Sequence, residues 1–521
     1  METEIELKFL VAPTDQDVVS QIQSVSADVL SHTVNKLSNT YFDTPERLLR
    51  QWDIGLRTRE HEDKIEQTIK TAGQVTGGLH QRPEYNVPLS SRWPELVLFP
   101  ENIWPNEANI EMLQDNIEAL FTTDFERTKW HLRMPSGTEV ELVYDVGDIR
   151  CGSDSQPINE IEIELITGNV DDVFVLAEQL NELLSVRLGF LSKAARGYQL
   201  SEQWQTEPKK MMECVKLAPN DTVEQAFIKC IESGIHFIQH HEQSYSEEPS
   251  LLALRRLTDG VALVRHSVWL FAGMLDPDAT AALRMELKRL LRSFLWVESA
   301  RQLKNITSKK SSFRKRLADC QQLISVIEER KGRNPTPDEV NQFFYSTEYN
   351  HTLLQLTRWL VTRGWRAHLS EEQREYGNSP IQHKSPEMLT RAWQILCDLV
   401  TDKAELTTQD YQDYDARLKR HLLTGVCLGN LYEREDRNPF RAPWVDLSEG
   451  VDELKILCLL QQIYDDAINE QEQAIEEDLE VIVTQKPVTK TTTKWLDDRK
   501  ESLLVALEQT KRSALNMEPY W

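Results

Sequence analysis

Polar and apolar side chains alternate strictly along the first segment of the chain, residues 2–9. In an extended strand the apolar side chains share one face, and the other face carries Glu2, Glu4, Glu6 and Lys8. A single face of this kind is typical of an edge strand wetted by solvent. It indicates a functional site only if other strands nearby also carry several charged residues on one face, and they do.

The same two-residue period recurs in further segments up to about residue 200. The eight strands predicted in this way are residues 2–9, 38–42, 54–59, 64–70, 81–87, 125–130, 139–145 and 160–165. Arginine and lysine concentrate on the middle strands, whereas carboxylates concentrate on the first and on the last two. Residues 15–30 instead have helical spacing, which predicts a helix packed outside the sheet.

Two arrangements fit such strands. An open sheet could leave the charged face in water, or the sheet could close into a barrel with its charged faces inward. We favour closure, because the charges are sorted by sign and about eight strands suffice to close a barrel. Buried unpaired charges would be prohibitive, so the lumen should hold water, ions and a ligand.

The residue types in that lumen point to phosphate chemistry with a hard metal ion. Arginine offers a planar fork and lysine a compact charge to phosphate oxygens. Glu4, Glu6, Glu162 and Glu164 offer the oxygen ligands that suit Mg²⁺ or Mn²⁺. We expect no histidine or cysteine on these faces. No covalent nucleophile stands out, which favours phosphoryl transfer by direct attack of water.

From about residue 207 the pattern changes to helical spacing with short connections. It predicts one or two helical bundles and a connection at residues 470–493. The predicted helices are residues 251–274, 278–304, 311–330, 350–368, 386–401, 410–431, 452–469 and 493–514. The fold class is therefore α+β, with an N-terminal antiparallel barrel and flanking helices, then an all-α domain. We place a barrel domain at 1–202, a linker at 203–218 and a helical domain at 219–521.

Composition narrows the functional classes. A net charge of −25 over 521 residues argues against a general nucleic-acid binder. Seven scattered cysteines without CxxC pairing fit reduced thiols. The chain shows no signal peptide and no apolar run of the ~18 residues that a membrane span needs, so we expect a cytoplasmic protein without a membrane partner.

Several motifs resemble those of one superfamily. Glu4-Ile5-Glu6-Leu7-Lys8 matches the ExExK signature of the CYTH, or triphosphate tunnel metalloenzyme, superfamily. Further similar stretches follow in order at residues 41–45, 55–59 and 191–198. The run at residues 76–87 resembles bacterial inorganic triphosphatases that join a CYTH to a CHAD domain, and residues 263–273 resemble the CHAD part.

This resemblance implies a tunnel that hydrolyses inorganic triphosphate to pyrophosphate and phosphate with Mg²⁺ or Mn²⁺, by attack of water on a terminal phosphorus. The implied substrate-binding residues are Lys8, Arg57, Arg59, Lys70, Arg82, Arg127, Lys129, Lys193 and Arg196. The implied metal ligands are Glu4, Glu6, Asp145, Glu162 and Glu164. The implied catalytic residues are Glu4, Glu6, Lys8, Arg57, Arg59 and Lys193. Glu84 is a tunnel residue of less defined role, and Glu2, Glu66, Glu139, Glu141 and Glu160 are weaker candidates.

The same resemblance leaves alternatives. Adenylate cyclases and thiamine triphosphatases of the superfamily share most of these residues, and a non-catalytic polyphosphate sensor would also keep them. CHAD domains bind polyphosphate on a basic surface, which here would comprise Arg255, Arg256, Arg265, His266, Lys288, Arg289, Arg292 and Arg301, with Lys309, Lys310, Arg314, Lys315 and Arg316 nearby. This chain departs from the dense His and Arg pattern of that family, so a scaffold or docking role competes with polyphosphate binding.

Overall fold

The computed structural model describes residues 2–61, 64–317, 321–476 and 490–521, in two compact units. Unit 1 comprises Met1–Glu207, Gln239–Glu248 and Pro337–Gly364. Unit 2 comprises Pro208–Ile238, Pro249–Thr336 and Trp365–Trp521. Two segments of unit 1 thus come from the helical half of the sequence. The domain boundaries derived from the sequence pattern stay a prediction.

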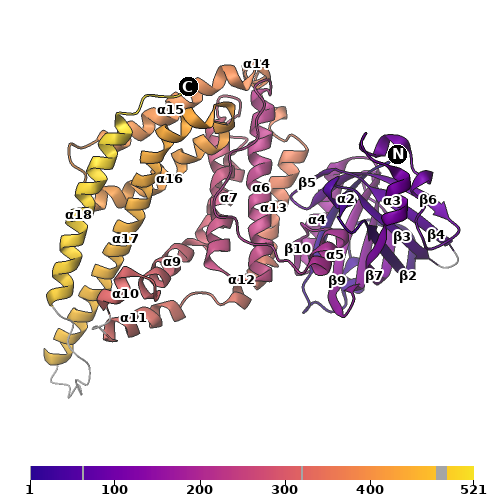
Figure 1. Cartoon of the computed structure of the whole chain (residues 1–521), viewed down its shortest axis with the longest axis horizontal. Coiled ribbons are helices and arrows are strands. Elements are labelled where there is room, and N and C mark those ends of the chain that lie inside the picture. Colours follow the sequence, from indigo (N-terminus) through magenta and orange to yellow (C-terminus); the bar gives the residue numbers. More distant parts are fainter. Residues whose placement is uncertain (1, 62–63, 318–320, 477–489) are drawn as a thin grey trace. The chain divides into compact units, whose positions relative to one another are not determined.

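Unit 1 is built on one antiparallel sheet, labelled in Figure 1. Its strands within the described residues are β1 (Glu2–Val11), β2 (Asp28–Asp43), β3 (Gly55–His61), β4 (Lys64–Lys70), β5 (Gln74–Thr76), β6 (Leu79–Leu89), β7 (Glu118–Arg133), β8 (Glu139–Cys151), β9 (Asp154–Thr167) and β10 (Val186–Leu188). Because β6 pairs with β1 as well as with β4, eight strands form a closed ring in the order β1-β9-β8-β7-β2-β3-β4-β6. The predicted eight-stranded barrel is confirmed, and β5 and β10 extend it at β6 and β1.

The apolar faces of these strands point outward and lie under helices and loops. Leu7, Phe9, Ile161 and Ile163 on the paired strands β1 and β9 are each 0% exposed. The covering elements of unit 1 are α1 (Val18–Ile22), α2 (Leu48–Gln51), η1 (Leu96–Leu98), η2 (Glu101–Ile103), α3 (Ile110–Asn116), α4 (Val170–Leu183) and α5 (Lys193–Glu202). Much of the hydrophobic core thus lies outside the ring. A further apolar cluster with Tyr41, Phe125 and Tyr198 adjoins the charged side chains that line the interior.

The helix predicted at residues 15–30 is wrong over most of its length. Only Val18–Ile22 are helical, and β2 already begins at Asp28. Val29 pairs with Leu132 of β7, and its side chain is 54% exposed. The apparent helical spacing therefore combined a short helix with the exposed end of a long strand.

Two helices of unit 1 come from sequence far beyond the barrel: α12 (Pro337–Phe344) and α13 (Thr347–Val361). The Asn350 amide of α13 donates to the Val186 carbonyl (2.7 Å) and accepts from the Leu188 amide (3.2 Å), so it binds the edge of β10. Arg358 donates to both carboxylate oxygens of Asp171 at 2.6 Å. A Cβ at Gly77 would lie 1.7 Å from the Thr357 hydroxyl, so the β5–β6 turn needs glycine there.

Unit 2 is helical throughout its named elements. Helix α6 (Val223–Glu247) begins in unit 2 and its last residues belong to unit 1. The others are α7 (Leu251–Leu270), α8 (Ala281–Ser293), α9 (Leu295–Thr307), α10 (Ser312–Leu317), α11 (Gln321–Gly332), η3 (Arg366–His368), α14 (Glu371–Asn378), α15 (Ile381–Thr401), α16 (Thr408–Leu428), η4 (Gly429–Leu431), α17 (Arg434–Glu476) and α18 (Lys490–Leu515). The expected all-α part is confirmed. No helix among the described residues is both long and apolar enough to cross a bilayer.

Several predicted helix limits were wrong. The predicted helix 278–304 is two helices, α8 and α9, which meet at Phe294. Helix α17 begins 18 residues before the predicted start at 452. It includes Pro439 and Pro443 in its interior, where proline argues against a helix in the sequence pattern. Of the predicted connection at 470–493, residues 477–489 lie outside the described residues, and the rest is helical.

Candidate active site

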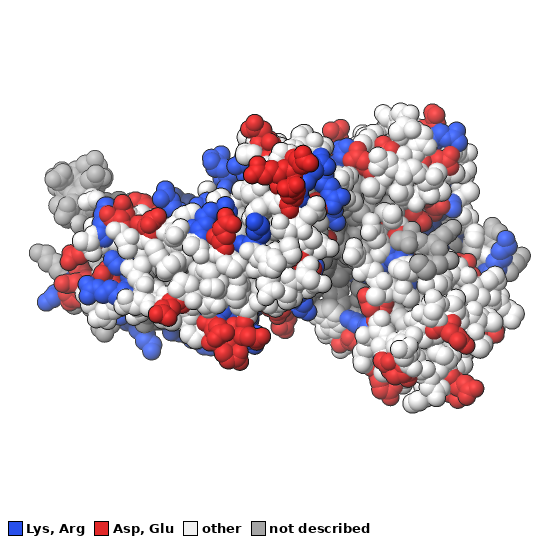
Figure 2. All heavy atoms as spheres, turned by 90° about the horizontal axis from the view of Figure 1, so that it is seen from above, with Lys and Arg blue, Asp and Glu red and all other residues white. Residues whose placement is uncertain are grey.

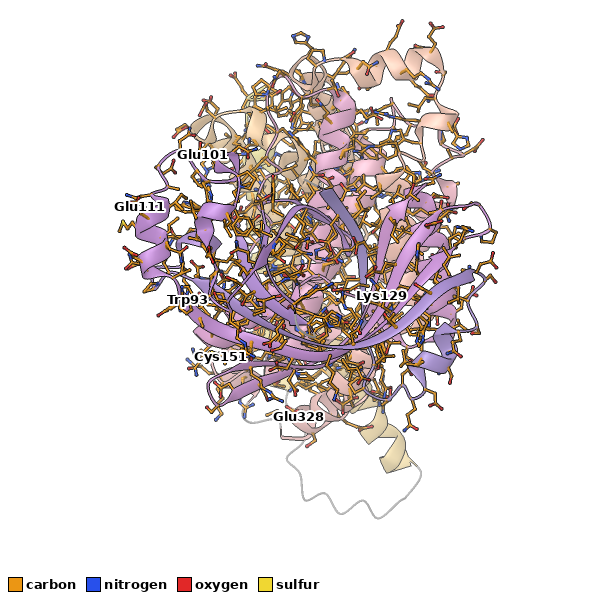
Figure 3. All side chains as sticks on the ribbon, turned by 90° about the vertical axis from the view of Figure 1, so that its right-hand side faces the viewer. Trp93, Glu101, Glu111, Lys129, Cys151 and Glu328 are labelled. Carbon is orange, nitrogen blue, oxygen red and sulfur yellow. The ribbon has the colours of Figure 1, made fainter. Side chains whose placement is uncertain are left out.

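The interior of the barrel holds a cavity of about 820 Å³ whose walls are mostly charged. Figure 3 looks toward the barrel, where the ribbons curve around a centre crowded with side chains. Eleven of the predicted site residues line the cavity: Glu4, Glu6, Lys8, Arg57, Arg59, Lys70, Arg82, Arg127, Glu162, Glu164 and Lys193. The cavity brings these residues together from six strands of the ring and from the start of α5.

Strand register explains how distant residues meet. Lys8 lies opposite Glu162, and Glu6 lies opposite Glu164, across the β1–β9 pair. On its other side β1 places Glu4 opposite Arg82 of β6. Opposed residues in an antiparallel pair have neighbouring side chains. Ring closure therefore brings carboxylates of β1 and β9 beside the arginine of β6.

One acidic group is already neutralised by the protein. Asp145, Glu160 and Glu162 could each offer one oxygen within 4.8 Å of the others, but four cations surround them. Lys8 Nζ lies 2.7 Å from Glu162, Lys193 Nζ 2.7 Å from Asp145, Arg127 Nη2 2.7 Å from Asp145 and Arg196 Nη1 3.1 Å from Glu160. Lys193 also pairs with Glu160. With so many ammonium and guanidinium partners, this group is a buried ion-pair network more than a vacant metal site.

The pKa shifts of this network agree with its pairing. Burial alone would raise the pKa of Glu160, but Lys193 and Lys8 outweigh it and lower the pKa to about 2. Burial alone would lower the pKa of Lys8, but Glu160 and Glu162 raise it well above its ordinary value. Glu160 and Lys8 therefore stay charged at neutral pH.

A second acidic group has few counter-charges. Glu6 of β1 faces Glu164 of β9, and Glu164 faces Glu141 of β8. Burial, Glu141 and Glu6 raise the pKa of Glu164 to about 7. Burial and Glu6 raise the pKa of Glu4 to about 8 despite its ion pair with Lys70. Opposed carboxylates repel each other. Glu4, Glu6, Glu141 and Glu164, called here the open acidic group, thus have the donor chemistry that a divalent cation would neutralise.

On the basic side of the cavity, the arginines have few anionic partners. The Arg57 and Arg82 Nε atoms are buried without a hydrogen-bond partner, and the Arg57 guanidinium lies as far as 3.8 Å from Glu84. Burial, Arg57 and Arg127 lower the pKa of Arg59 to about 9. Crowded cations with unpartnered donors favour a polyanion between them.

Three predicted site residues do not line the cavity. Asp145 is 0% exposed beneath Arg127 and Lys193. Arg196 on α5 pairs with Glu160 and donates to the Pro157 carbonyl. Lys129, labelled in Figure 3, pairs with Glu141 at 2.9 Å and keeps 38% of its side chain exposed. Their assigned roles stay predictions.

Sequence reasoning misjudged two further residues. Glu160 was ranked among the weaker candidates, yet it is 0% exposed and central to the ion-pair network. The expectation of no histidine on the strand faces was wrong, because His80 lines the cavity opposite Glu6. Strand β6 begins at Leu79, two residues before the predicted start. His80 therefore belongs to the strand and points to the same face as Arg82. Burial lowers the pKa of His80 to about 4, against the effect of Glu6.

Several of the basic residues predicted for the helical part are paired. Arg255 and Arg301 both contact Glu298, at 2.6 and 3.0 Å, and Arg256 contacts Asp259 at 2.9 Å. His266 is fully buried, and burial lowers its pKa well below the ordinary value. On the face drawn in Figure 2, Lys and Arg are mixed with Asp and Glu. The predicted polyphosphate surface is therefore partly neutralised by its own neighbours.

Comparison with protein families places both parts of the chain. Residues 2–198 match the CYTH domain, and residues 230–465 match the CHAD domain. The chain contains a CYTH domain and a CHAD domain. Its CYTH part carries the barrel cavity, and its CHAD part spans the helices from α7 to α16, including α12 and α13 of unit 1.

Individual relatives match the two parts separately. An inorganic triphosphatase from Haemophilus influenzae is 36% identical over 208 residues, which are 40% of this CYTH–CHAD chain and 58% of that relative. The match thus spans little more than half of that relative. Among solved structures, the CHAD domain from the plant Ricinus communis has a TM-score of 0.40 and 13% identity, covering 60% of this chain and 98% of its own. A protein from Hippeastrum with a dominant triphosphatase activity has a TM-score of 0.28 and 19% identity, covering 38% and 95%.

Proposed function

We propose that this CYTH–CHAD protein is a metal-dependent inorganic triphosphatase that acts inside its barrel. The observation that carries the proposal is the separation of charge in one cavity, with arginine donors that lack acceptors on one side and under-neutralised carboxylates on the other. The CYTH match and the Haemophilus influenzae triphosphatase support it. A linear triphosphate with a divalent cation would complement both sides.

The substrate would lie against Arg57, Arg59 and Arg82. Strand pairing fixes the backbone positions from which their guanidinium groups extend into the cavity. Arg59 Nε already donates to Asn39 at 2.8 Å, which sets the orientation of its fork. These groups hold the phosphates in line and neutralise charge that develops on their oxygens.

The open acidic group fits a hard divalent cation, with Glu4, Glu6 and Glu164 as its ligands and Glu141 beside them. Such a cation, when bound, neutralises phosphate oxygens and lowers the pKa of a bound water. Lys8, on the same strand face as Glu4 and Glu6, and Lys193 are buried, charged and held by Glu162. They orient the terminal phosphate and stabilise the leaving phosphate oxygens.

Phosphate release from inorganic triphosphate tests the proposal. Arg57→Ala and Glu6→Gln should each lower turnover by about 100-fold, the size of effect expected when one transition-state contact is lost. The matched control is Arg150→Ala, which removes an arginine of β8 that is 57% exposed and paired with Asp148. Wild-type turnover in both cavity variants would contradict the proposal.

Metal dependence is tested on the same release assay. Chelation should stop the reaction, and added Mg²⁺ or Mn²⁺ should restore it. Glu164→Gln should raise the metal concentration needed for half-maximal rate, since it removes one ligand, whereas Glu139→Gln should not. Glu139 is bound by Arg133 at 2.8 Å and lies outside the cavity wall. Full activity after chelation would exclude the metal.

The alternatives make different products. An adenylate cyclase would convert ATP to cyclic AMP, and a sensor would bind triphosphate and release no phosphate. A product assay with triphosphate, ATP and thiamine triphosphate separates these cases. Titration of long-chain polyphosphate by calorimetry, with Arg265→Ala as the variant, tests binding at the helical part.

A further inference from the structure

Unit 2 contains a cavity of about 670 Å³ that shares no residue with the barrel site. It lies among residues 211–216, helices α15, α16 and the first turns of α17, and the last two residues of the chain. Its size is that of a pocket for a small organic molecule. The side chains that matter are Trp393, Phe440, Trp444, Tyr520 and Trp521 on the apolar side, with Arg434, Arg437 and Arg441 on the polar side.

The aromatic side chains form a connected wall. The Phe440 ring centroid lies 5.1 Å from Trp521, 5.4 Å from Tyr520 and 6.4 Å from Trp393, all in edge-to-face arrangements. Trp444 is 1% exposed and belongs to the hydrophobic core of this unit. Such a wall offers flat apolar surface to a ligand and few hydrogen bonds.

The three arginines lie at spacings of three and four along α17, so they share one face of the helix. In the described part of the chain, no carboxylate lies within the 4.0 Å salt-bridge distance of any of them. Arg437 Nη1 instead donates to the Cys214 thiol at 3.0 Å. Lys216 adds a fourth cation, and Glu213 is the single acidic residue of the wall.

The walls also hold donors that lack acceptors. The Nε atoms of Arg437 and Arg441 and the indole Nε1 atoms of Trp393 and Trp444 are buried without a hydrogen-bond partner. Each such N–H leaves its dipole uncompensated, which adds to the positive potential of the cavity. The cavity therefore combines an aromatic wall, guanidinium groups without a carboxylate partner, and N–H donors without an acceptor.

We propose that this cavity binds an organic anion, in which a planar aromatic body carries one phosphate or carboxylate group. The body would lie against the Phe440 wall, and the anionic group would receive the guanidinium forks. A neutral aromatic ligand would bury the arginines without a partner, which is unfavourable. A long inorganic polyanion would leave the aromatic wall unused. The site is independent of the proposed triphosphatase reaction.

The probe for this site is 1-naphthyl phosphate, added to the full-length protein and followed by quenching of tryptophan fluorescence. Three tryptophans line the cavity, so occupancy should quench emission and saturate below about 1 mM. Arg437→Gln and Arg441→Gln should each weaken binding about tenfold, the effect of losing one charge-assisted hydrogen bond. Phosphate release from triphosphate should not change in either variant.

The matched control is Arg417→Gln, an exposed arginine of α16 outside the cavity wall, which should bind the probe as the wild type does. Thermal unfolding of each variant identifies any loss of fold, and Arg441→Lys, which keeps the charge, should retain most of the affinity. Absence of saturable binding to the wild type would overturn the proposal. Binding of the probe to the arginine variants with wild-type affinity would also overturn it. So would binding of neutral 1-naphthol or of inorganic triphosphate at this site as tightly as the probe.

Discussion

At the scale of single residues, the barrel contains cations held by several buried carboxylates and cations that keep hydrogen-bond donors for a ligand. Arg196 and Lys193 are bound by buried carboxylates, whereas Arg57 and Arg82 have donors without partners. Removing one partner of a buried ion pair strands the other charge, but removing a crowded cation relieves repulsion. Loss of Arg196 should therefore cost more stability than loss of Arg57.

Arg196→Met should destabilise the protein by about 3 kcal/mol, because it leaves Glu160 buried with fewer counter-charges. Arg57→Ala should change stability by less than about 1 kcal/mol and yet lower turnover far more. Urea unfolding of both variants measures the loss of stability, which should be larger for Arg196→Met. Phosphate release measures turnover in the same two variants. Equal loss of stability in the two variants would show that the cavity arginines are structural.

Glu242 predicts a pH dependence of stability. It is 3% exposed, and burial raises its pKa from the ordinary 4.5 to about 7, against the effects of Arg187 and the Tyr349 hydroxyl. The folded state therefore holds this proton more tightly than the unfolded state. The resulting stability is complete below pH 4.5 and is lost as the pH rises through about 7, by at most about 3 kcal/mol.

Glu242→Gln should remove this part of the pH dependence, because the amide does not titrate. Urea unfolding at several pH values between about 4.5 and 8 compares the two proteins. Glu247→Gln serves as the control, since Glu247 lies on the same helix and is bound by Thr206 and Gln243. If the free energy of unfolding depends on pH as steeply in Glu242→Gln as in the wild type, Glu242 is not the group responsible.

Residue identity in the cavity was predictable where strand parity was clear. Two-residue alternation placed Glu4, Glu6 and Lys8 on one face, and register then fixed their neighbours. Parity could not rank Glu160 above Glu164, because both share a face, and burial depends on which strands close around them. His80 was missed through a strand limit that was two residues too late.

At the scale of elements, α13 is the least expected part of the barrel unit. Its Asn350 binds both backbone groups at the edge of β10, and β10 pairs with β1 at Phe9–Val11. The Gly189 amide donates to the Lys8 carbonyl, and the Lys8 amide donates to Gly78. The helix therefore supports the two backbone segments that hold Lys8.

Asn350→Ala should lower stability by about 1–3 kcal/mol, because it leaves buried backbone groups of β10 without partners. It should also lower turnover, while triphosphate affinity changes less, since Arg57 and Arg82 are untouched. Hydrogen exchange at residues 186–189 measures the loosening directly. Asn305→Ala, at an exposed position of α9, is the control. Unchanged exchange would show that β10 needs no such support.

At the scale of the whole molecule, sequence pattern predicted the order of a barrel followed by helices. It could not assign α12 and α13 to the barrel unit. Their contacts, such as Arg358 with Asp171, join residues 187 positions apart, and no local period records such a pairing. The ring closure between β1 and β6 was reached by counting strands, and register was needed to establish it.

A chain cut after residue 207 should therefore be a poor substitute for unit 1. It keeps every residue of the cavity and loses Asn350, Thr357 and Arg358. We expect its unfolding midpoint in urea to fall, and phosphate release to fall with it. A 1–207 fragment with the midpoint and turnover of the full chain would show that the later helices are dispensable.

The position of α13 in the sequence also sets an order of events during synthesis. Residue 350 leaves the ribosome 162 residues after Leu188, the strand residue it binds. At about 5–20 residues per second, that interval is roughly 8–30 s. The nascent barrel must pass this time with the edge of β10 uncovered, a template on which another chain could pair. Protection by a chaperone is thus most valuable during that interval, before α13 has been synthesised and can bind β10.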